Sequence, residues 1–231
     1  MIRRNLAPHG QGVRGLNLSR SSISFEGAFG RIFRALPPAE FGTTDADTQN
    51  NLNLLGYEMV AKNDGPKDGP DTEESGIPAL YTYLGQFIDH DITFDPASSL
   101  QKQNDPDGLV DYRTPKFDLD NVYGRGPDDQ PYLYDFSKGS DKAKFLLGKP
   151  LSGAPAINPP AQDLARNSPN LAAGQNARAI IGDPRNDENA LVSQLQTLFL
   201  RFHNRLIDDQ GMSFREAQRS LRFHYQWMLF N

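Results

Sequence analysis

Four polar side chains crowd into six positions of the segment "GQFIDHDITF", among apolar neighbours. They are Gln86, Asp89, His90 and Asp91. On a helix, Gln86 and His90 point to the same side because they are four residues apart, whereas the two carboxylates point elsewhere. Burying such groups without partners costs about 2–7 kcal/mol each, so a ligand, a metal or other side chains must satisfy them. The residue types alone leave a structural histidine and a functional one equally open.

A second polar group lies in "IIGDPRNDENALV", where Arg185 and Glu188 are three residues apart. This segment stands at the start of a predicted helix. A glutamate in a first turn complements the helix dipole, and an arginine there is often a surface residue. Taken alone, the segment indicates no particular chemistry.

A third group lies in "RTPKFDLDNVYG", where Thr114, Lys116, Asp118 and Asp120 alternate along the chain. In an extended loop this spacing directs a hydroxyl, a backbone carbonyl and two carboxylates toward one point. Hard oxygen donors in that number suit Ca²⁺ rather than Zn²⁺. The alternative interpretation is an exposed strand of alternating polarity.

Amphipathic helices must position these groups. The first is predicted to open at Pro78, a residue suited to a first helical turn, and to bury a stripe of Leu80, Tyr83, Leu84 and Phe87.

Two further helices are predicted near the end of the chain. One covers roughly 20 residues, with a face marked by Leu191, Leu195, Leu198, Phe202 and Leu206. The other begins at Ser213, which has the spacing of a capping box with Glu216, and continues through Ala217, Leu221 and Met228.

The rest of the chain is dominated by irregular segments. Its 20 Gly and 17 Pro predict many turns, and the region from about 95 to 180 reads as long loops. Residues 1 to about 50 predict an extended arm, flexible over residues 1–25. The fold class predicted is therefore mainly α with long loops, in a single domain over residues 1–231. Because "HYQWMLFN" ends inside an apolar helix, we expect this domain to be incomplete at its C-terminus.

Composition limits the partners and the compartment. A net charge of −5 argues against nucleic acid as the main partner, and no apolar run has the length of a membrane span. The absence of cysteine excludes disulfides and thiolate metal sites. The N-terminus lacks the apolar stretch of a secretory signal, so a cytoplasmic location is the default and export by a signal-independent route stays open.

Taken together and in order, four motifs resemble the animal-type haem peroxidases of the peroxidase–cyclooxygenase superfamily, in particular the cysteine-free bacterial members. The resemblance extends from about residue 30 to the end of the chain, and the motifs are "GQFIDHDITF", "DLDNVYG", "GDPRNDE" and "LFLRFHNRL". It implies haem b and Ca²⁺ as cofactors, reduction of hydrogen peroxide, and oxidation of an organic donor or a halide.

The resemblance also implies roles for individual residues. His90 matches the distal histidine that takes a proton from hydrogen peroxide, and Arg185 matches the distal arginine that stabilises the polarised O–O bond. Gln86 matches the glutamine that hydrogen-bonds solvent or a halide above the iron. Asp89 and Glu188 match two carboxylates that can form ester bonds to haem methyl groups. General acid–base and electrostatic catalysis require such a base and such a fixed charge.

Asp91 matches a calcium ligand. In the resemblance it is joined by Thr114, the backbone oxygen of Lys116, Asp118 and Asp120. Calcium bound beside the histidine would hold its imidazole in place.

The sequence departs from the family pattern at two points. Asn189 stands where some members carry a methionine that forms a third haem link, so we expect no such link. The family's proximal histidine is expected beyond the end of this chain, in the missing C-terminal half. Of the remaining histidines, His203 belongs to a motif that is structural in the family, and neither it nor His224 is expected to be the axial ligand.

Two other functions remain open. One is a non-catalytic, calcium-stabilised peroxidase-like module or truncated relic without haem turnover. The other is a non-haem iron oxygenase, which needs two histidines and one carboxylate and therefore a second histidine that no motif here supplies.

Overall fold

The computed structural model describes residues 36–37, 40–59, 76–94, 111–152, 160–168, 172, 174 and 176–231. The arm predicted at residues 1–25 lies outside these ranges. Two compact units are distinguished, one of residues 30–81 and one that contains residues 82–231. Whether the chain is one incomplete domain stays a prediction.

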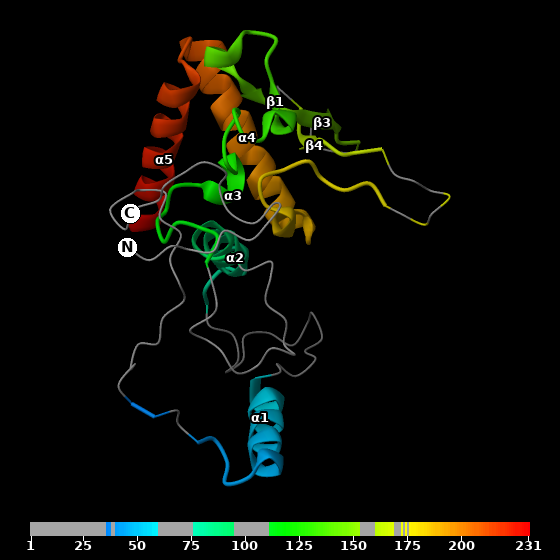
Figure 1. Cartoon of the computed structure of the whole chain (residues 1–231), viewed down its shortest axis with the longest axis vertical. Helices are drawn as coiled ribbons and strands as arrows, with labels where there is room; N and C mark the ends of the chain where they lie inside the picture. Colours follow the sequence, from blue (N-terminus) through cyan, green and yellow to red (C-terminus); the bar gives the residue numbers. More distant parts are fainter. Residues whose placement is uncertain are drawn as a thin grey trace, which may run out of the picture. The chain divides into compact units, whose positions relative to one another are not determined.

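In the first unit, a helix begins within the last residues of the predicted extended arm and continues beyond it. This helix is α1 (Asp45–Met59; Figure 1). None of its residues is buried. Its apolar side chains follow no clear helical period, which is why pattern reading missed it. The signal that could have found it is local: the backbone N–H of Asp47 donates to Thr44 Oγ1 (3.1 Å), as at a helix N-terminus.

The second unit is built on three longer helices (Figure 1). They are α2 (Leu80–Ile92), α4 (Ala190–Gln210) and α5 (Phe214–Phe230), and a single turn, α3 (Asp120–Tyr123), lies among them. Gly211 joins α4 to α5 in the left-handed region with φ 67°, and the predicted capping box of Ser213 and Glu216 opens α5. The expectation of a mainly α fold is confirmed.

Aromatic rings hold the three helices together. Phe87 of α2 stacks on Phe199 of α4 with ring centroids 5.1 Å apart, and both rings meet the edge of Tyr225 from α5. Such contacts add about 0.5–1.5 kcal/mol per pair beyond burial. The polar end of α2 is thereby anchored against α4.

Short strands and 3₁₀ turns flank α4. Strands β1 (Tyr134–Asp135) and β2 (Lys144–Phe145) pair antiparallel, as do β3 (Leu147–Pro150) and β4 (Gln162–Leu164). The 3₁₀ turns are η2 (Pro131–Leu133), η3 (Ser140–Lys142) and η5 (Pro184–Asp187). Asn204 of α4 bonds both the N–H and the C=O of Phe145, so the first sheet is tied to the helix.

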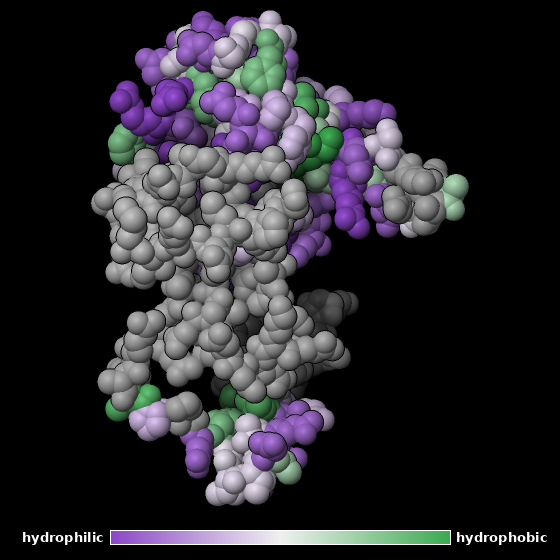
Figure 2. Space-filling view, viewed as in Figure 1, coloured by the Kyte–Doolittle hydropathy of each residue, from purple (hydrophilic) through white to green (hydrophobic). Residues whose placement is uncertain are grey.

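Two predicted buried faces are wrong in part. Leu80 is 55% exposed, and on α4 Leu191 and Leu198 are exposed, whereas the buried face contains Gln196 and His203. The prediction counted apolar residues alone, and the true core face of α4 includes polar side chains that find buried partners. On the visible face of this unit, hydrophilic residues predominate and the apolar areas between them are small (Figure 2).

Candidate active site

His90 lies at the polar end of α2, and it is 6% exposed. Its Nδ1 is 2.7 Å from Oδ1 of Asn186, in the turn η5. Nδ2 of Asn186 donates in turn to Oε1 of Gln196 (2.8 Å), on α4. Residues 90, 186 and 196 thus converge in one buried contact.

One helical turn before His90, Gln86 makes a similar link. Its Oε1 accepts a hydrogen bond from Nδ2 of Asn189 (3.1 Å). Asn189 is also the N-cap of α4, because its Oδ1 accepts from the backbone N–H of Val192. Residues 86 and 90 of α2 therefore meet residues 189 and 186, which places both side chains beside the start of α4.

Arg185 lies against the end of the same helix. Its Nη2 donates to the backbone oxygens of Thr93 (2.6 Å) and His90 (3.2 Å), and its guanidinium stands 4.8 Å from the centroid of the Phe94 ring. Arg185 and His90 are distant in the chain, and the structure places the guanidinium of Arg185 on the backbone carbonyl of His90. Among the described residues, Nη1 of Arg185 makes no hydrogen bond.

A buried carboxylate fixes this arginine. Asp183 is fully buried, accepts from Nε and Nη2 of Arg185, and pairs with Arg113 at 2.6 Å. Burial, the largest influence, would raise the pKa of Asp183, but the hydrogen bonds and charges of the two arginines bring that pKa below its ordinary value. Its Oδ1 also accepts from the N–H of Arg185, which caps η5.

The two carboxylates predicted to bind haem belong to Asp89, directly before His90, and to Glu188, directly before Asn189. Asp89 and Glu188 are both exposed, and neither carboxylate has a hydrogen-bond partner within the described part of the chain. Both remain available to an external group.

Behind His90, the next residue of α2 faces the protein interior. Asp91 is fully buried, and within the described residues its carboxylate oxygens make no hydrogen bond of normal length and angle, although the backbone N–H groups of Leu119 and Asp120 lie near enough to act on its charge. Burial above all, with the nearby charges of Asp118 and Asp120, raises the pKa of Asp91 to about 7, against weaker opposition from backbone N–H groups. An unpaired buried carboxylate of this kind is the group that a cation would satisfy.

The predicted calcium loop lies opposite Asp91. Thr114 Oγ1 donates to Asp118 Oδ2 (2.8 Å), and the N–H of Thr114 donates to Asp120 Oδ2 (3.1 Å). The carbonyl of Lys116 accepts the N–H of Asp118 (3.0 Å). Burial first, and then the charge of Asp120, raises the pKa of Asp118 to about 6.

No three His, Asp or Glu side chains in the described ranges are grouped closely enough to form a metal site by themselves. The loop between the acidic residues is strained, since Leu119 is buried with φ 61°. The calcium ligand set therefore stays a prediction, supported by the orphaned Asp91 oxygens.

Residues 98–210 match the family model described as "Animal haem peroxidase". This match supports the peroxidase superfamily, to which the sequence motifs also point. The matched range includes Arg185, Glu188 and the acidic loop, whereas Gln86 and His90 precede it. No curated protein matches the chain.

Two histidines of the chain occupy structural positions. His203 is fully buried; its Nε2 is 3.2 Å from the carbonyl oxygen of Ala143, and its Nδ1 is 2.9 Å from the hydroxyl of Tyr123. Burial lowers the pKa of His203 to about 4. His224 places its Nδ1 2.8 Å from the carbonyl of Ser220 on its own helix.

Sequence reading missed the residues that hold the candidate site in place. These are Arg113, Asp183, Asn186, Asn189 and Gln196. A signal existed for Asp183, which precedes a proline in the pattern of an N-cap before a first turn. No local pattern marks Gln196, because its role depends on a residue ten positions away that reaches it through the fold.

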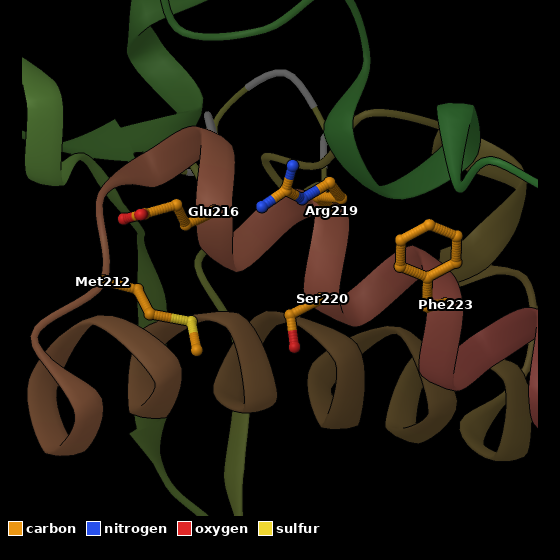
Figure 3. Close-up of a pocket in the computed structure, with 5 residues that line it drawn as sticks. All are labelled: Met212, Glu216, Arg219, Ser220 and Phe223. Carbon is orange, nitrogen blue, oxygen red and sulfur yellow. The ribbon is translucent and has the colours of Figure 1, made fainter.

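An open groove of about 530 Å³ lies elsewhere, along α5 (Figure 3). Its lining residues are Met212, Glu216, Arg219, Ser220 and Phe223, and none of the predicted site residues is among them. Within the residues that the structure describes, no helix is both long and apolar enough to span a membrane.

Proposed function

We propose that this chain forms the distal side of a haem peroxidase site that reduces hydrogen peroxide and oxidises an organic donor or a halide. The observation that carries the proposal is that two side chains of α2 contact the segment of residues 185–189. The His90 ring contacts Asn186, Gln86 contacts Asn189, and Arg185 bonds the backbone carbonyl of His90. A structural role alone does not require a base, an amide and a fixed cation on two segments that contact each other.

The residues present fit a haem. Asp89 and Glu188 offer exposed carboxylates without competing partners, which suits ester bonds to the edge of a porphyrin. When bound, haem b supplies the redox-active iron at which peroxide is reduced. The chain's own residues would bind the haem edge and control the proton.

The proton chemistry falls to His90. With its Nδ1 held by Asn186, the second ring nitrogen is the one left to accept a proton from hydrogen peroxide and to return it to the departing oxygen. Arg185 brings a positive charge to the end of the helix that carries His90. It is anchored by Asp183 and by two carbonyls, so it needs no reorganisation as negative charge develops. Gln86 would hydrogen-bond solvent or a halide beside the imidazole.

We further propose a calcium ion held by Asp91, Thr114, the carbonyl of Lys116, Asp118 and Asp120. Carboxylate, hydroxyl and carbonyl oxygens are the donors that Ca²⁺ prefers, and a cation would neutralise the orphaned Asp91.

The axial ligand is proposed to come from elsewhere. His203 has both ring nitrogens engaged in the core, and His224 lies on the same helix as its own hydrogen-bond partner. We therefore propose that residues 1–231 supply the distal part of a bacterial-type peroxidase domain, with a cytoplasmic location as the default.

The engagement of His203 and His224 in other contacts also favours a second candidate, a calcium-stabilised module without haem turnover. Haemin titration discriminates between the two. A Soret band together with peroxide-dependent oxidation of a dye supports the peroxidase, and its absence in the presence of calcium supports the module.

Replacing His90 with Ala tests the assignment of the base. We expect the reaction of the haem-loaded protein with peroxide to slow by about 10²–10⁴-fold. His224→Ala is the matched control, since it removes an exposed imidazole outside the site and should leave the rate unchanged. An unchanged rate in the His90 variant removes this residue from the mechanism.

A further inference from the structure

Three buried side chains form a line of hydrogen bonds from α4 to the imidazole. Gln196 and Asn186 are fully buried, and His90 is nearly so. Oε1 of Gln196 accepts from Nδ2 of Asn186 (2.8 Å), and Oδ1 of Asn186 faces Nδ1 of His90 (2.7 Å). No charged atom takes part. These hydrogen bonds therefore fix the orientation of the imidazole without placing a charge beside it.

The direction of this line determines which ring nitrogen carries the proton. Because Asn186 gives its N–H to Gln196, only its oxygen remains for His90, and an oxygen can only accept. Nδ1 of His90 must then be the donor, and Nε2 keeps its lone pair. The other tautomer would set the Nδ1 lone pair against the Asn186 oxygen at 2.7 Å, a repulsive contact in a buried place.

The backbone also restrains Asn186. Its N–H donates to the carbonyl of Asp183 (3.1 Å), inside the turn that Asp183 caps. The amide therefore has a fixed origin on η5 and a fixed partner on α4. One cost is visible, since Nε2 of Gln196 is buried without a partner within the described residues.

Reversing both amides would not remove the unpaired buried atom of Gln196. Gln196 would then donate to Asn186, Asn186 would donate to His90, and the unpaired atom would become the oxygen of Gln196. The reversed line would impose the opposite tautomer, with the proton on Nε2. A measurement of the His90 tautomer therefore shows in which direction both hydrogen bonds run, the one between Gln196 and Asn186 and the one between Asn186 and His90.

We propose that Asn186, oriented by Gln196, is a positioning residue that holds His90 in its Nδ1–H tautomer and keeps Nε2 free to act as a base. The use of that base on peroxide rests on the proposed function. The tautomer itself does not, because it follows from contacts within this chain.

The first test is ¹⁵N NMR of the 231-residue chain labelled at histidine, with the signals of His90 identified from a His90→Gln variant. We expect a pyrrole-type signal for Nδ1 and a pyridine-type signal for Nε2. Asn186→Leu removes the acceptor at nearly constant volume, and we expect the proton to move to Nε2, the tautomer favoured in water. Asn186→Asp keeps an acceptor and should keep the proton on Nδ1.

Gln196 provides an independent pair if the Asn186 variants do not fold. Gln196→Glu retains the acceptor for Nδ2 of Asn186 and should preserve the tautomer, whereas Gln196→Leu should yield a mixture. A proton on Nε2 in the wild-type chain overturns the proposal. So does a proton that stays on Nδ1 in Asn186→Leu, or, where that variant does not fold, in Gln196→Leu.

A second readout uses the haem-loaded protein. Loss of the orienting partner of a functional histidine should slow the reaction with hydrogen peroxide about 100-fold in Asn186→Leu, and the Asp variant should recover most of that loss. If wild-type protein does not react with peroxide at all, the proposed function fails, and the NMR result still decides the tautomer.

Discussion

Asp91→Asn separates the calcium proposal from a purely structural role for the acidic loop. The wild-type carboxylate is fully buried without a hydrogen bond of normal length and angle within the described residues, and its pKa is raised from 3.8 to about 7. A raised pKa means that the folded protein binds the proton more tightly than the unfolded chain does. Without calcium, stability is therefore highest below the unfolded pKa and falls as the pH rises toward 7.

The size of this effect follows from the same values. A carboxyl pKa that moves from 3.8 to about 7 corresponds to about 4 kcal/mol of unfolding free energy lost between the two. An amide at position 91 removes the charge but leaves a buried polar group, which costs about 1–3 kcal/mol. The net expectation is a gain of about 1–3 kcal/mol for Asp91→Asn above pH 7 in calcium-free buffer.

Urea unfolding with and without chelator, at about pH 5 and about pH 8, measures both effects. In calcium-free buffer the difference between wild type and variant should be small at the lower pH and large at the higher one. Added Ca²⁺ should stabilise the wild type and reverse the order of the two proteins. A variant that is less stable than wild type at the higher pH without calcium, or a wild type that gains nothing from calcium, would refute the reasoning.

Three further changes test the surroundings of the site. Asp183→Asn leaves Arg113 and Arg185 without their shared buried carboxylate, so we expect a loss of about 3 kcal/mol in urea unfolding, with a weaker reaction with peroxide in the haem-loaded protein. Tyr123→Phe leaves Nδ1 of His203 without its hydrogen bond, so thermal unfolding should show a loss of about 1–3 kcal/mol while any peroxide reaction persists. At Gly182 an added Cβ would lie 2.7 Å from the carbonyl oxygen of Asn121, so Gly182→Ala should destabilise the chain and speed hydrogen exchange in η5, and unchanged exchange there would contradict this packing.

The sequence predicted best those features that depend on neighbouring residues. The capping box at Ser213 and the three longer helices of the second unit follow from short-range spacing, and the structure contains them. It failed where a helix lacks periodicity, as in α1, and where polar residues occupy the core face, as at Gln196 and His203. Their burial is possible only because Asn186 and Tyr123, far away in the chain, supply partners.

The candidate site shows the same division. Motifs singled out Gln86, His90 and Arg185, but nothing local indicated what would hold them. Asp183 was passed over because a single aspartate before a proline also begins many surface turns. Its role becomes visible only when the fold places Arg113, from another loop, on its second oxygen.

The position of Arg185 relative to His90 depends on the end of a helix. α2 ends at Ile92, so the carbonyl of His90 is among its last four and has no partner within the helix. Nη2 of Arg185 bonds this carbonyl and that of Thr93, and a cation there also complements the negative end of the helix dipole. The cation is thus attached to the helix that carries the imidazole, while Asn186, one residue further along the turn, holds the ring itself. Two adjacent residues of η5 therefore fix the base and the charge against the same helix end, so a movement of the turn would displace both together and preserve their mutual geometry.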